Sequence, residues 1–288
     1  MKIGVIDIGS NSIRLMLHDG ATVDKTCIIT KLSENLVATG KLCEGAIERS
    51  IKAIETLKQK AISWGAERIL AFARAAVRGA ENGDYFVSKT KEITGVVVEV
   101  VSGETEAVLG LLGALNGKDG GIIDIGGAST EIIVSKVDNP IYSHSMQFGV
   151  VKLTELCGQN VKVLEKFIGE ILTEYGAVPT SNFYGIGGTA TSLSAIALEL
   201  EIYDRKKVDG YVLTAEKLED IIELLDSKTI EERKQIKGLQ KGRAEVILSG
   251  AVLLRSIMKM LKIQSITISE DDNLEGYLIW KKKNEKKI

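Results

Sequence analysis

The sequence predicts an α/β protein with two related domains, and two observations support this. The segment VIDIGSNSIRLML, which begins at Val5, aligns without a gap with IIDIGGASTEIIV, which begins at Ile122. Strand-like and helical patterns also alternate after each copy, as expected for α/β layers. We therefore expect a first domain at 1–118 and a second at 119–288, joined at the glycine-rich turn 116–121. The last helix, at about 273–288, can pack back on the first domain.

Each copy of the repeat is typical of a β-hairpin. Apolar residues lead up to an aspartate, a turn of small residues follows, and a second apolar strand leaves the turn. In the alignment of the two copies, Asp7 matches Asp124, Gly9 matches Gly126, Ser12 matches Ser129, and Arg14 matches Glu131. Two matching copies predict two domains with the same starting motif.

The remaining elements follow from hydrophobic periodicity. We expect helices at 47–64, 104–116, 161–175, 189–200, 215–225 and 243–261, before a lysine-rich last helix. We expect strands at 68–73, 96–101, 122–135, 140–148, 183–186 and 265–269. Strands and helices thus alternate in both halves of the chain.

Composition excludes several classes of protein. With 288 residues, 44% hydrophobic content and only 2 prolines, the chain is expected to fold throughout. No apolar run of about 18 residues is present, so we expect a cytoplasmic protein with no membrane partner. The formal net charge of -2 offers no general attraction for nucleic acid, and none is expected as a partner.

The cysteines and histidines narrow the chemistry further. Cys27, Cys43 and Cys157 form no C-x-x-C pair and are expected to be reduced, partly buried thiols. His18 and His144 are the only histidines, which is too few for most zinc hydrolase centres. Catalysis is therefore expected to depend on carboxylates and backbone groups.

The two hairpin turns are candidate phosphate loops. Backbone N–H groups in a turn of small residues can approach an anion closely. The candidate phosphate-binding residues in these turns are Ser10, Asn11, Ser12, Gly126, Gly127, Ala128 and Ser129. Asp7 and Asp124, at the ends of the preceding strands, are candidate ligands for Mg²⁺, which prefers oxygen donors. The alternative is that each Asp and Gly only closes a hairpin.

A third glycine cluster spans 185–189 and lies between a predicted strand and a predicted helix. The N–H groups at a helix N-terminus favour an anion, so Gly187, Gly188 and Thr189 are further candidate phosphate-binding residues. Glycines at such a turn also serve close packing, and this alternative stays open.

Together these residues resemble the exopolyphosphatase / guanosine pentaphosphate phosphatase (Ppx/GppA) family, within the actin, Hsp70 and sugar kinase superfamily. The motifs are Asp7-Ile-Gly-Ser-Asn-Ser12 with Arg14, Ala76-Val-Arg78 with Asn82, Ser102-Gly103 with Glu106-Ala107, Asp124-Ile-Gly-Gly-Ala-Ser-Thr-Glu131 and Gly185-Ile-Gly-Gly-Thr189. The resemblance spans nearly the whole chain. It implies two actin-like (ribonuclease H-like) domains with a central cleft, in a short form without an extra C-terminal helical domain.

The resemblance also implies roles for individual residues. Glu106 matches the glutamate that activates the attacking water, although a carboxylate there also complements the helix dipole. Asp124 and Glu131, with Asp7, are implied to hold Mg²⁺ or Mn²⁺ or to orient water, and Glu131 could instead be a solvated strand residue. The residues implied to contact phosphate outside the loops are Arg14, Arg78 and Asn82. A surface position for Arg78 is the alternative.

The sequence departs from the family pattern at a few positions. Ala128 replaces a third glycine in the second loop, and Thr105 replaces a first glutamate beside Glu106. Late in the chain, Arg243-Ala-Glu245 and Leu274-Glu-Gly276 replace Arg-Ala-Asp and Arg-Glu-Gly. The family pattern therefore predicts an altered charge in the later part of the site.

The resulting functional hypothesis is a phosphohydrolase. It would release terminal phosphate from inorganic polyphosphate, guanosine pentaphosphate, or both, and a short substrate fits the short form of the chain. Two alternatives stay open: a kinase of the same superfamily, and a non-catalytic sensor that binds polyphosphate or a guanosine polyphosphate. A homodimer is also among the expectations, because relatives associate.

Overall fold

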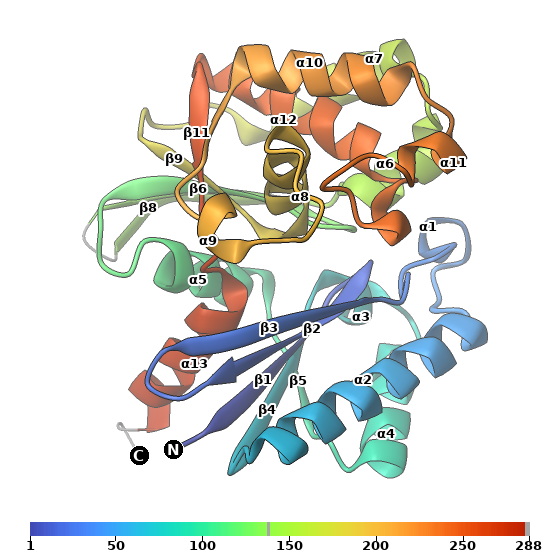
Figure 1. Ribbon diagram of the computed structural model, residues 1–288, viewed down its shortest axis with the longest axis vertical. Helices are drawn as coiled ribbons and strands as arrows, with labels where there is room; N and C mark the ends of the chain where they lie inside the picture. The colour runs from blue at the N-terminus through green and yellow to red at the C-terminus, as the bar shows by residue number, and fades with distance from the viewer. Residues whose placement is uncertain (137–138, 286–288) are drawn as a thin grey trace. The chain divides into compact units, whose positions relative to one another are not determined.

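The computed structural model describes residues 1–136 and 139–285 (Figure 1). The chain divides into two compact units. Unit 1 comprises Met1–Leu109 and the segment from Asn273 onward, whereas unit 2 comprises Gly110–Asp272. The first unit thus ends before residue 118, and the last helix belongs to it. That helix is described as far as Glu285, and 286–288 lie outside the described residues.

Unit 1 is built on a five-stranded sheet in the order β3-β2-β1-β4-β5. Its strands are β1 (Ile3–Ile8), β2 (Ser12–His18), β3 (Thr22–Ile29), β4 (Arg68–Ala73) and β5 (Val98–Val100). Its helices are α1 (Leu36–Thr39), α2 (Glu44–Trp64), α3 (Ala75–Gly79), α4 (Gly83–Thr94) and α13 (Asn273–Glu285), and α5 (Gly103–Ala114) begins in this unit. The first strand pairs antiparallel with β2 and parallel with β4.

Both faces of β1 are buried, which explains its continuous apolar sequence. Ile6 and Ile8 point to the face covered by α2 and α4, where they join one hydrophobic cluster. Ile3 and Val5 point to the opposite face and pack with residues of α5 and α13 in a second cluster. Figure 1 shows α2 and α4 on one side of this sheet and α13 on the other. Strand alternation therefore sorts successive residues into two cores.

Unit 2 repeats this topology in a six-stranded sheet ordered β10-β11-β9-β6-β7-β8. Its strands are β6 (Gly120–Ile125), β7 (Thr130–Lys136), β8 (Asn139–Met146), β9 (Phe183–Ile186), β10 (Val212–Thr214) and β11 (Ser265–Ile268). The order β8-β7-β6-β9-β11 matches β3-β2-β1-β4-β5, with β10 added at the edge. The repeat noticed in the sequence therefore extends to the order of five strands.

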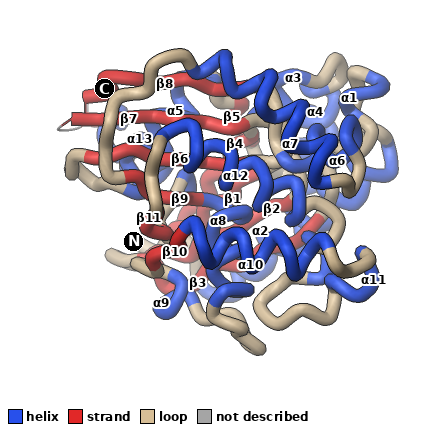
Figure 2. The backbone as a smooth tube through the Cα atoms, turned by 90° about the horizontal axis from the view of Figure 1, so that it is seen from above, coloured by secondary structure: helices blue, strands red, loops and turns tan. Residues whose placement is uncertain are grey.

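The helices of unit 2 enclose one large core. They are α6 (Val150–Cys157), α7 (Val161–Ile171), α8 (Gly187–Ala197), α9 (Arg205–Val208), α10 (Ala215–Asp226), α11 (Ile230–Arg233) and α12 (Ile247–Leu261). Helix α12 is buried along most of its length and lies between α7 and α10 (Figures 1 and 2). A helix that is apolar on nearly all sides belongs at the centre of a core.

Most predicted elements are present, with shifted ends. The strands expected at 122–135 are β6 and β7, and the helix expected at 161–175 is α7 followed by a 3₁₀ turn at Leu172–Tyr175. The sequence did not predict the strands β3 and β10 or the helices α1, α3, α4, α6, α9 and α11. Within the part of the chain that the structure describes, no helix combines the length and the apolar character needed to cross a bilayer.

The C-terminal helix α13 is anchored to unit 1 by Tyr277. Its ring stacks on Phe72 with centroids 4.4 Å apart, and its hydroxyl donates a hydrogen bond to Glu99 Oε2 at 2.6 Å. We expect Tyr277→Ala to lower the free energy of unfolding of unit 1 by about 3 kcal/mol or more, because a buried aromatic ring is lost. Tyr277→Phe keeps the ring and should cost about 1 kcal/mol.

Urea unfolding followed by tryptophan fluorescence measures this difference, because both tryptophans, Trp64 and Trp280, lie in unit 1. Equal stability of the Ala and Phe variants would contradict the anchoring role of the ring.

Candidate functional site

The first phosphate loop is a tight turn between β1 and β2. The N–H of Gly9 donates to the carbonyl of Ser12 at 3.0 Å, and Ser10 and Asn11 are buried in the turn. Residues that follow β3 donate further hydrogen bonds to the loop. There the N–H of Thr30 donates to the Asn11 carbonyl at 3.0 Å, and the N–H of Ser33 donates to the Ser10 carbonyl at 2.9 Å. Hydrogen bonds within the hairpin and from the segment after β3 therefore both fix the loop.

The second phosphate loop has the same construction. The N–H of Gly126 donates to the carbonyl of Ser129 at 3.0 Å, and the N–H of Val150, at the start of α6, donates to the Gly126 carbonyl at 2.9 Å. Gly149 permits this approach, since a Cβ there would lie 2.3 Å from the Gly126 oxygen. Ala128 is accommodated without a positive φ, so this position does not require glycine.

In unit 1, two carboxylates and three guanidinium groups form a buried cluster. Arg74 donates from Nε to Asp7 Oδ1 and from Nη1 to Glu106 Oε1, both at 3.0 Å. Arg14 donates from Nε to Asp7 Oδ2 at 3.2 Å, and Arg78 donates from Nη1 to Glu106 Oε2 at 3.1 Å. Three guanidinium groups thus lie beside the first loop. Their N–H donors suit a phosphate oxygen.

The secondary structure of unit 1 explains why these carboxylates and guanidinium groups lie together. Arg14 lies directly opposite Asp7 in the antiparallel register, and Arg74 follows the carboxyl end of β4, which runs parallel to β1. Arg78 is in the last turn of α3, and Glu106 is in the first turn of α5. Elements that end at one edge of the sheet thus bring together residues far apart in sequence.

Glu106 is more than a carboxylate that complements a helix dipole. It is 3% exposed, and both oxygens accept hydrogen bonds from guanidinium groups. Arg78 is not a free surface residue either, because it also donates to the Val101 carbonyl at 2.8 Å. Both residues implied by the family resemblance therefore belong to one cluster with Asp7.

Unit 2 places two carboxylates in the corresponding position. Asp124 and Glu131 are directly opposite each other in the β6–β7 register and are almost completely buried. Side chains at such positions point to the same face, with Cβ atoms about 4.5–5.5 Å apart. Ser145 Oγ donates to Glu131 Oε1 at 2.6 Å. The burial of Glu131 contradicts the alternative that it is a solvated strand residue.

The surroundings of this acidic pair are also buried. The Tyr175 hydroxyl donates to the Thr130 carbonyl at 2.8 Å, and burial, followed by the negative charge of Glu131, raises the pKa of Tyr175. The third glycine cluster adjoins Asp124. Gly187 has φ of +76°, and a Cβ there would lie 2.5 Å from Asp124 Oδ1. Glycine at 187 is thus required by both backbone conformation and space.

The first turn of α8 completes the unit 2 site. The Thr189 hydroxyl donates to the Ile125 carbonyl at 2.8 Å, which ties the helix start to the second loop. A Cβ at Gly188 would lie 2.3 Å from Arg243 Nη1, so this guanidinium packs directly on the helix start. Arg243, left without a role by the sequence, therefore contributes positive charge beside the glycine cluster.

Asn82 does not join the cluster of unit 1. Its Oδ1 accepts a hydrogen bond from the N–H of Leu42 at 2.8 Å, and its Nδ2 donates to the Leu42 carbonyl at 2.9 Å. The side-chain amide therefore matches one peptide group and fixes the segment before α2. We assign Asn82 this structural role in place of the phosphate contact expected from the sequence.

The two units differ in how well they fit a metal ion. Within residues 1–136 and 139–285, no group of three or more His, Cys, Asp or Glu side chains is arranged to hold one. Asp7 does not fit the expected ligand role, because guanidinium groups already bind both its oxygens. Asp124 and Glu131 fit better, since two adjacent carboxylates suit a Mg²⁺ or Mn²⁺ ion that keeps several water ligands.

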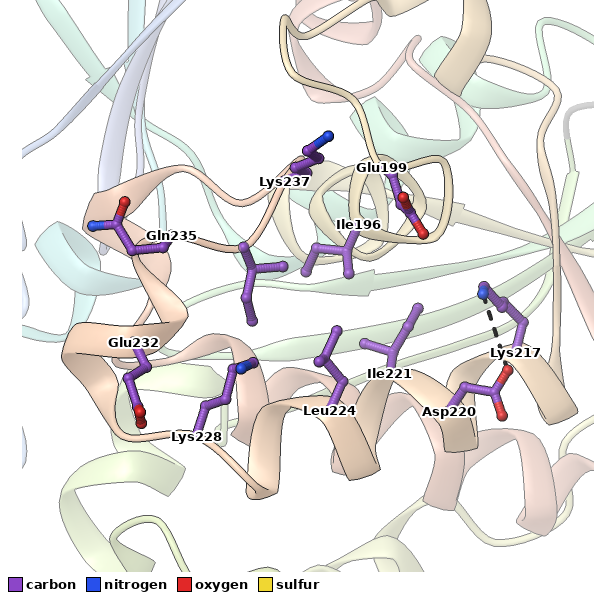
Figure 3. A pocket seen from close by; sticks show the side chains of 11 residues that line it. Ile196, Glu199, Lys217, Asp220, Ile221, Leu224, Lys228, Glu232, Gln235 and Lys237 are labelled. Carbon is purple, nitrogen blue, oxygen red and sulfur yellow. Dashed lines mark ion pairs between the residues drawn. The ribbon is translucent and has the colours of Figure 1, made fainter.

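A separate cavity of about 320 Å³ lies in unit 2 among α8, α10 and α11 (Figure 3). Ile196, Ile221 and Leu224 form part of its apolar lining, and Lys217 pairs with Asp220 at 4.0 Å on its rim. Its lining includes none of the residues that the sequence singled out for the site. The cavity is therefore distinct from the two phosphate loops.

Arg74 is the main site residue that sequence reasoning missed. Its only signal was its place directly after a strand predicted at 68–73 and shortly before the Arg78 motif. Such a position lies at the carboxyl edge of a parallel pair, where sites of α/β proteins are usually found.

Relatives of this chain are found among phosphatases. Exopolyphosphatase 2 of Mycobacterium tuberculosis is 30% identical over 96% of this chain and 97% of its own length. A bifunctional 3-dehydroquinate synthase/phosphatase of Fusobacterium nucleatum is 29% identical, and the match covers 95% of this chain but 46% of that protein. A guanosine-5'-triphosphate,3'-diphosphate pyrophosphatase of Photobacterium profundum is 28% identical, with coverages of 94% and 57%.

Solved structures and a family model agree with these relatives. The Aquifex aeolicus PPX-GPPA enzyme is 30% identical and superimposes with a TM-score of 0.78 over 97% of this chain and 99% of that chain. The predicted fold class, α/β with two actin-like units, is confirmed. The model of the Ppx/GppA phosphatase family matches residues 5–285. Together with the two loops and their charged clusters, this match shows that the chain belongs to the Ppx/GppA phosphatase family.

Proposed function

We propose that this protein hydrolyses the terminal phosphoanhydride bond of inorganic polyphosphate or of a guanosine polyphosphate. The observation that carries the proposal is the position of Glu106, a buried carboxylate fixed between Arg74 and Arg78 next to the Asp7 loop. Relatives named exopolyphosphatase and guanosine pyrophosphatase support this class of substrate.

The substrate would be bound by turn amides and guanidinium groups. Both loops offer N–H groups in turns of small residues, and the cluster in unit 1 contains three guanidinium groups. The Arg78 side chain is 26% exposed, against 14% for those of Arg14 and Arg74, so we assign the first contact with phosphate to Arg78. A guanidinium can grip two phosphate oxygens at once.

In the proposed reaction a water oxygen attacks the terminal phosphorus, and the bond from that phosphorus to the bridging oxygen breaks. Glu106 accepts the proton lost by the water, and the bridging oxygen leaves with the shortened chain. Arg78 and the loop amides hold the phosphoryl oxygens in line for the attack. A Mg²⁺ or Mn²⁺ ion bound by Asp124 and Glu131 would offset negative charge on the phosphate oxygens.

One observation favours a second function, a non-catalytic sensor. Both oxygens of Glu106 already accept hydrogen bonds from guanidinium groups, so one of these bonds must break before the carboxylate can accept a proton from water. If phosphate binding does not draw a guanidinium away, the protein would bind the anion without hydrolysis. Turnover therefore separates the two functions.

Several further expectations remain proposals. The choice between polyphosphate and guanosine pentaphosphate depends on contacts beyond the terminal phosphate. A cytoplasmic location, the absence of a nucleic-acid partner and a homodimer stay predictions from the sequence and the family resemblance.

Glu106→Gln tests the hydrolase directly. We expect kcat for phosphate release from short polyphosphate to fall about 10²–10⁴-fold, because an amide cannot accept the proton of the attacking water. Glu104→Gln is the matched control, since Glu104 lies in the same first turn of α5 but is exposed. A Glu106→Gln variant that keeps the parent kcat, with Glu104→Gln behaving identically, would exclude Glu106 as the base.

Asp124→Asn tests the divalent ion. We expect the parent protein to lose phosphate release in EDTA and to regain it on addition of Mg²⁺. The variant should need a higher Mg²⁺ concentration for half-maximal rate, because one carboxylate ligand is lost. Rates measured over a Mg²⁺ titration provide the comparison. An unchanged Mg²⁺ requirement in the variant would place the ion elsewhere.

A further inference from the structure

Arg74 bridges the two buried carboxylates of unit 1. Two nitrogen atoms of one guanidinium bind Asp7 Oδ1 and Glu106 Oε1, each at 3.0 Å. A Cβ placed on Gly9 would lie 3.3 Å from its third nitrogen, Nη2, so the group also adjoins the first loop. Arg14 also binds Asp7, and Arg78 also binds Glu106. Arg74 links the two carboxylates through one guanidinium.

The Arg74 bridge offsets the free-energy cost of burying two negative charges. The Asp7 side chain is 0% exposed and that of Glu106 is 2% exposed, so water screens neither charge. Two buried carboxylates that approach one position repel each other, and each is strongly destabilising unless a cation pairs with it. Folding therefore requires a cation between the two carboxylates, and the Arg74 side chain provides it.

The two units differ in the residue at the position that Arg74 occupies. Asp7 lies opposite Phe72 in the β1–β4 register, and Asp124 lies opposite Ile186 in the β6–β9 register. The position two residues further along is Arg74 in unit 1 and Gly188 in unit 2. The strand end that brings the Arg74 side chain to Asp7 therefore carries no side chain at the matched position of unit 2, where the Arg243 guanidinium packs against Gly188 instead.

The residue that faces the aspartate across each hairpin also differs in charge between the units. Arg14 faces Asp7 across β1 and β2, whereas Glu131 faces Asp124 across β6 and β7. The two matched positions are therefore arginines in unit 1, whereas they are a glutamate and a glycine in unit 2.

We infer that Arg74 is a built-in cation that takes the place of a divalent metal ion between Asp7 and Glu106. It fixes both carboxylates and excludes Mg²⁺ from the position between them. Arg74 is thereby also a positioning residue for Glu106, and only this part rests on the proposed function. An ammonium at the same place would keep the charge, whereas a neutral side chain would leave two carboxylates arranged for a metal ion.

The test is a manganese titration that needs no substrate. The parent for this test carries Asp124→Asn and Glu131→Gln, which removes the carboxylates of unit 2. Arg74→Met is added in one variant and Arg74→Lys in another. Mn²⁺ binding is measured by isothermal titration calorimetry and by the loss of the free-ion electron paramagnetic resonance signal.

We expect the Arg74→Met variant to gain one Mn²⁺ site per chain that the parent and the Arg74→Lys variant lack. Its melting temperature should rise by about 3 °C or more at Mn²⁺ ten times Kd, because only the folded form assembles the site. Adding Glu106→Gln to this variant should abolish the gained site.

A folded Arg74→Met variant that binds no more Mn²⁺ than its parent overturns the inference. If the Arg74→Lys variant gains the same Mn²⁺ site, the inference is also overturned. Arg74→Gln is a second neutral variant, and if neither neutral variant folds with or without Mn²⁺, Arg74 is a structural tie and the cation role is wrong. Loss of phosphate release in any of these variants bears only on the proposed function.

Discussion

The site of unit 1 depends on compensating buried negative charge at the end of β1. Asp7 is fully buried where the chain turns into the first loop, and a buried carboxylate is strongly destabilising unless a cation pairs with it. The antiparallel register supplies Arg14, and the parallel strand β4 ends in Arg74. Arg74 then reaches Glu106, so the position of the candidate base follows from the need to neutralise Asp7.

The two copies of the hairpin have the same backbone geometry but differently charged side chains. Each turn is closed by a glycine N–H that donates to a serine carbonyl at 3.0 Å, and each is supported from behind by the segment that follows the third strand. Unit 1 pairs its aspartate with arginines, whereas unit 2 places Glu131 opposite Asp124. These differences underlie the two proposed roles, a base fixed by guanidinium groups in unit 1 and a carboxylate pair for a divalent ion in unit 2.

Local patterns predicted the hairpins, the loops and most strands, because alternation and turn residues are properties of neighbouring residues. They did not predict Arg74, whose partners are 67 and 32 positions away in sequence. Asp7 was expected to bind metal by analogy with Asp124, but the change from Glu131 to Arg14 in the aligned copies already pointed to an ion pair. Asn82 was assigned to phosphate from its motif, whereas its amide matches the Leu42 peptide group, a tertiary contact that no local pattern shows.

A crystal structure of the unmodified protein grown with Mn²⁺, with anomalous scattering recorded at the manganese edge, tests the charge arrangement most directly. The account predicts an anomalous peak beside Asp124 and Glu131, no peak beside Asp7, and the Arg74 guanidinium bound to both Asp7 and Glu106. A manganese peak between Asp7 and Glu106, with Arg74 turned away, would contradict it.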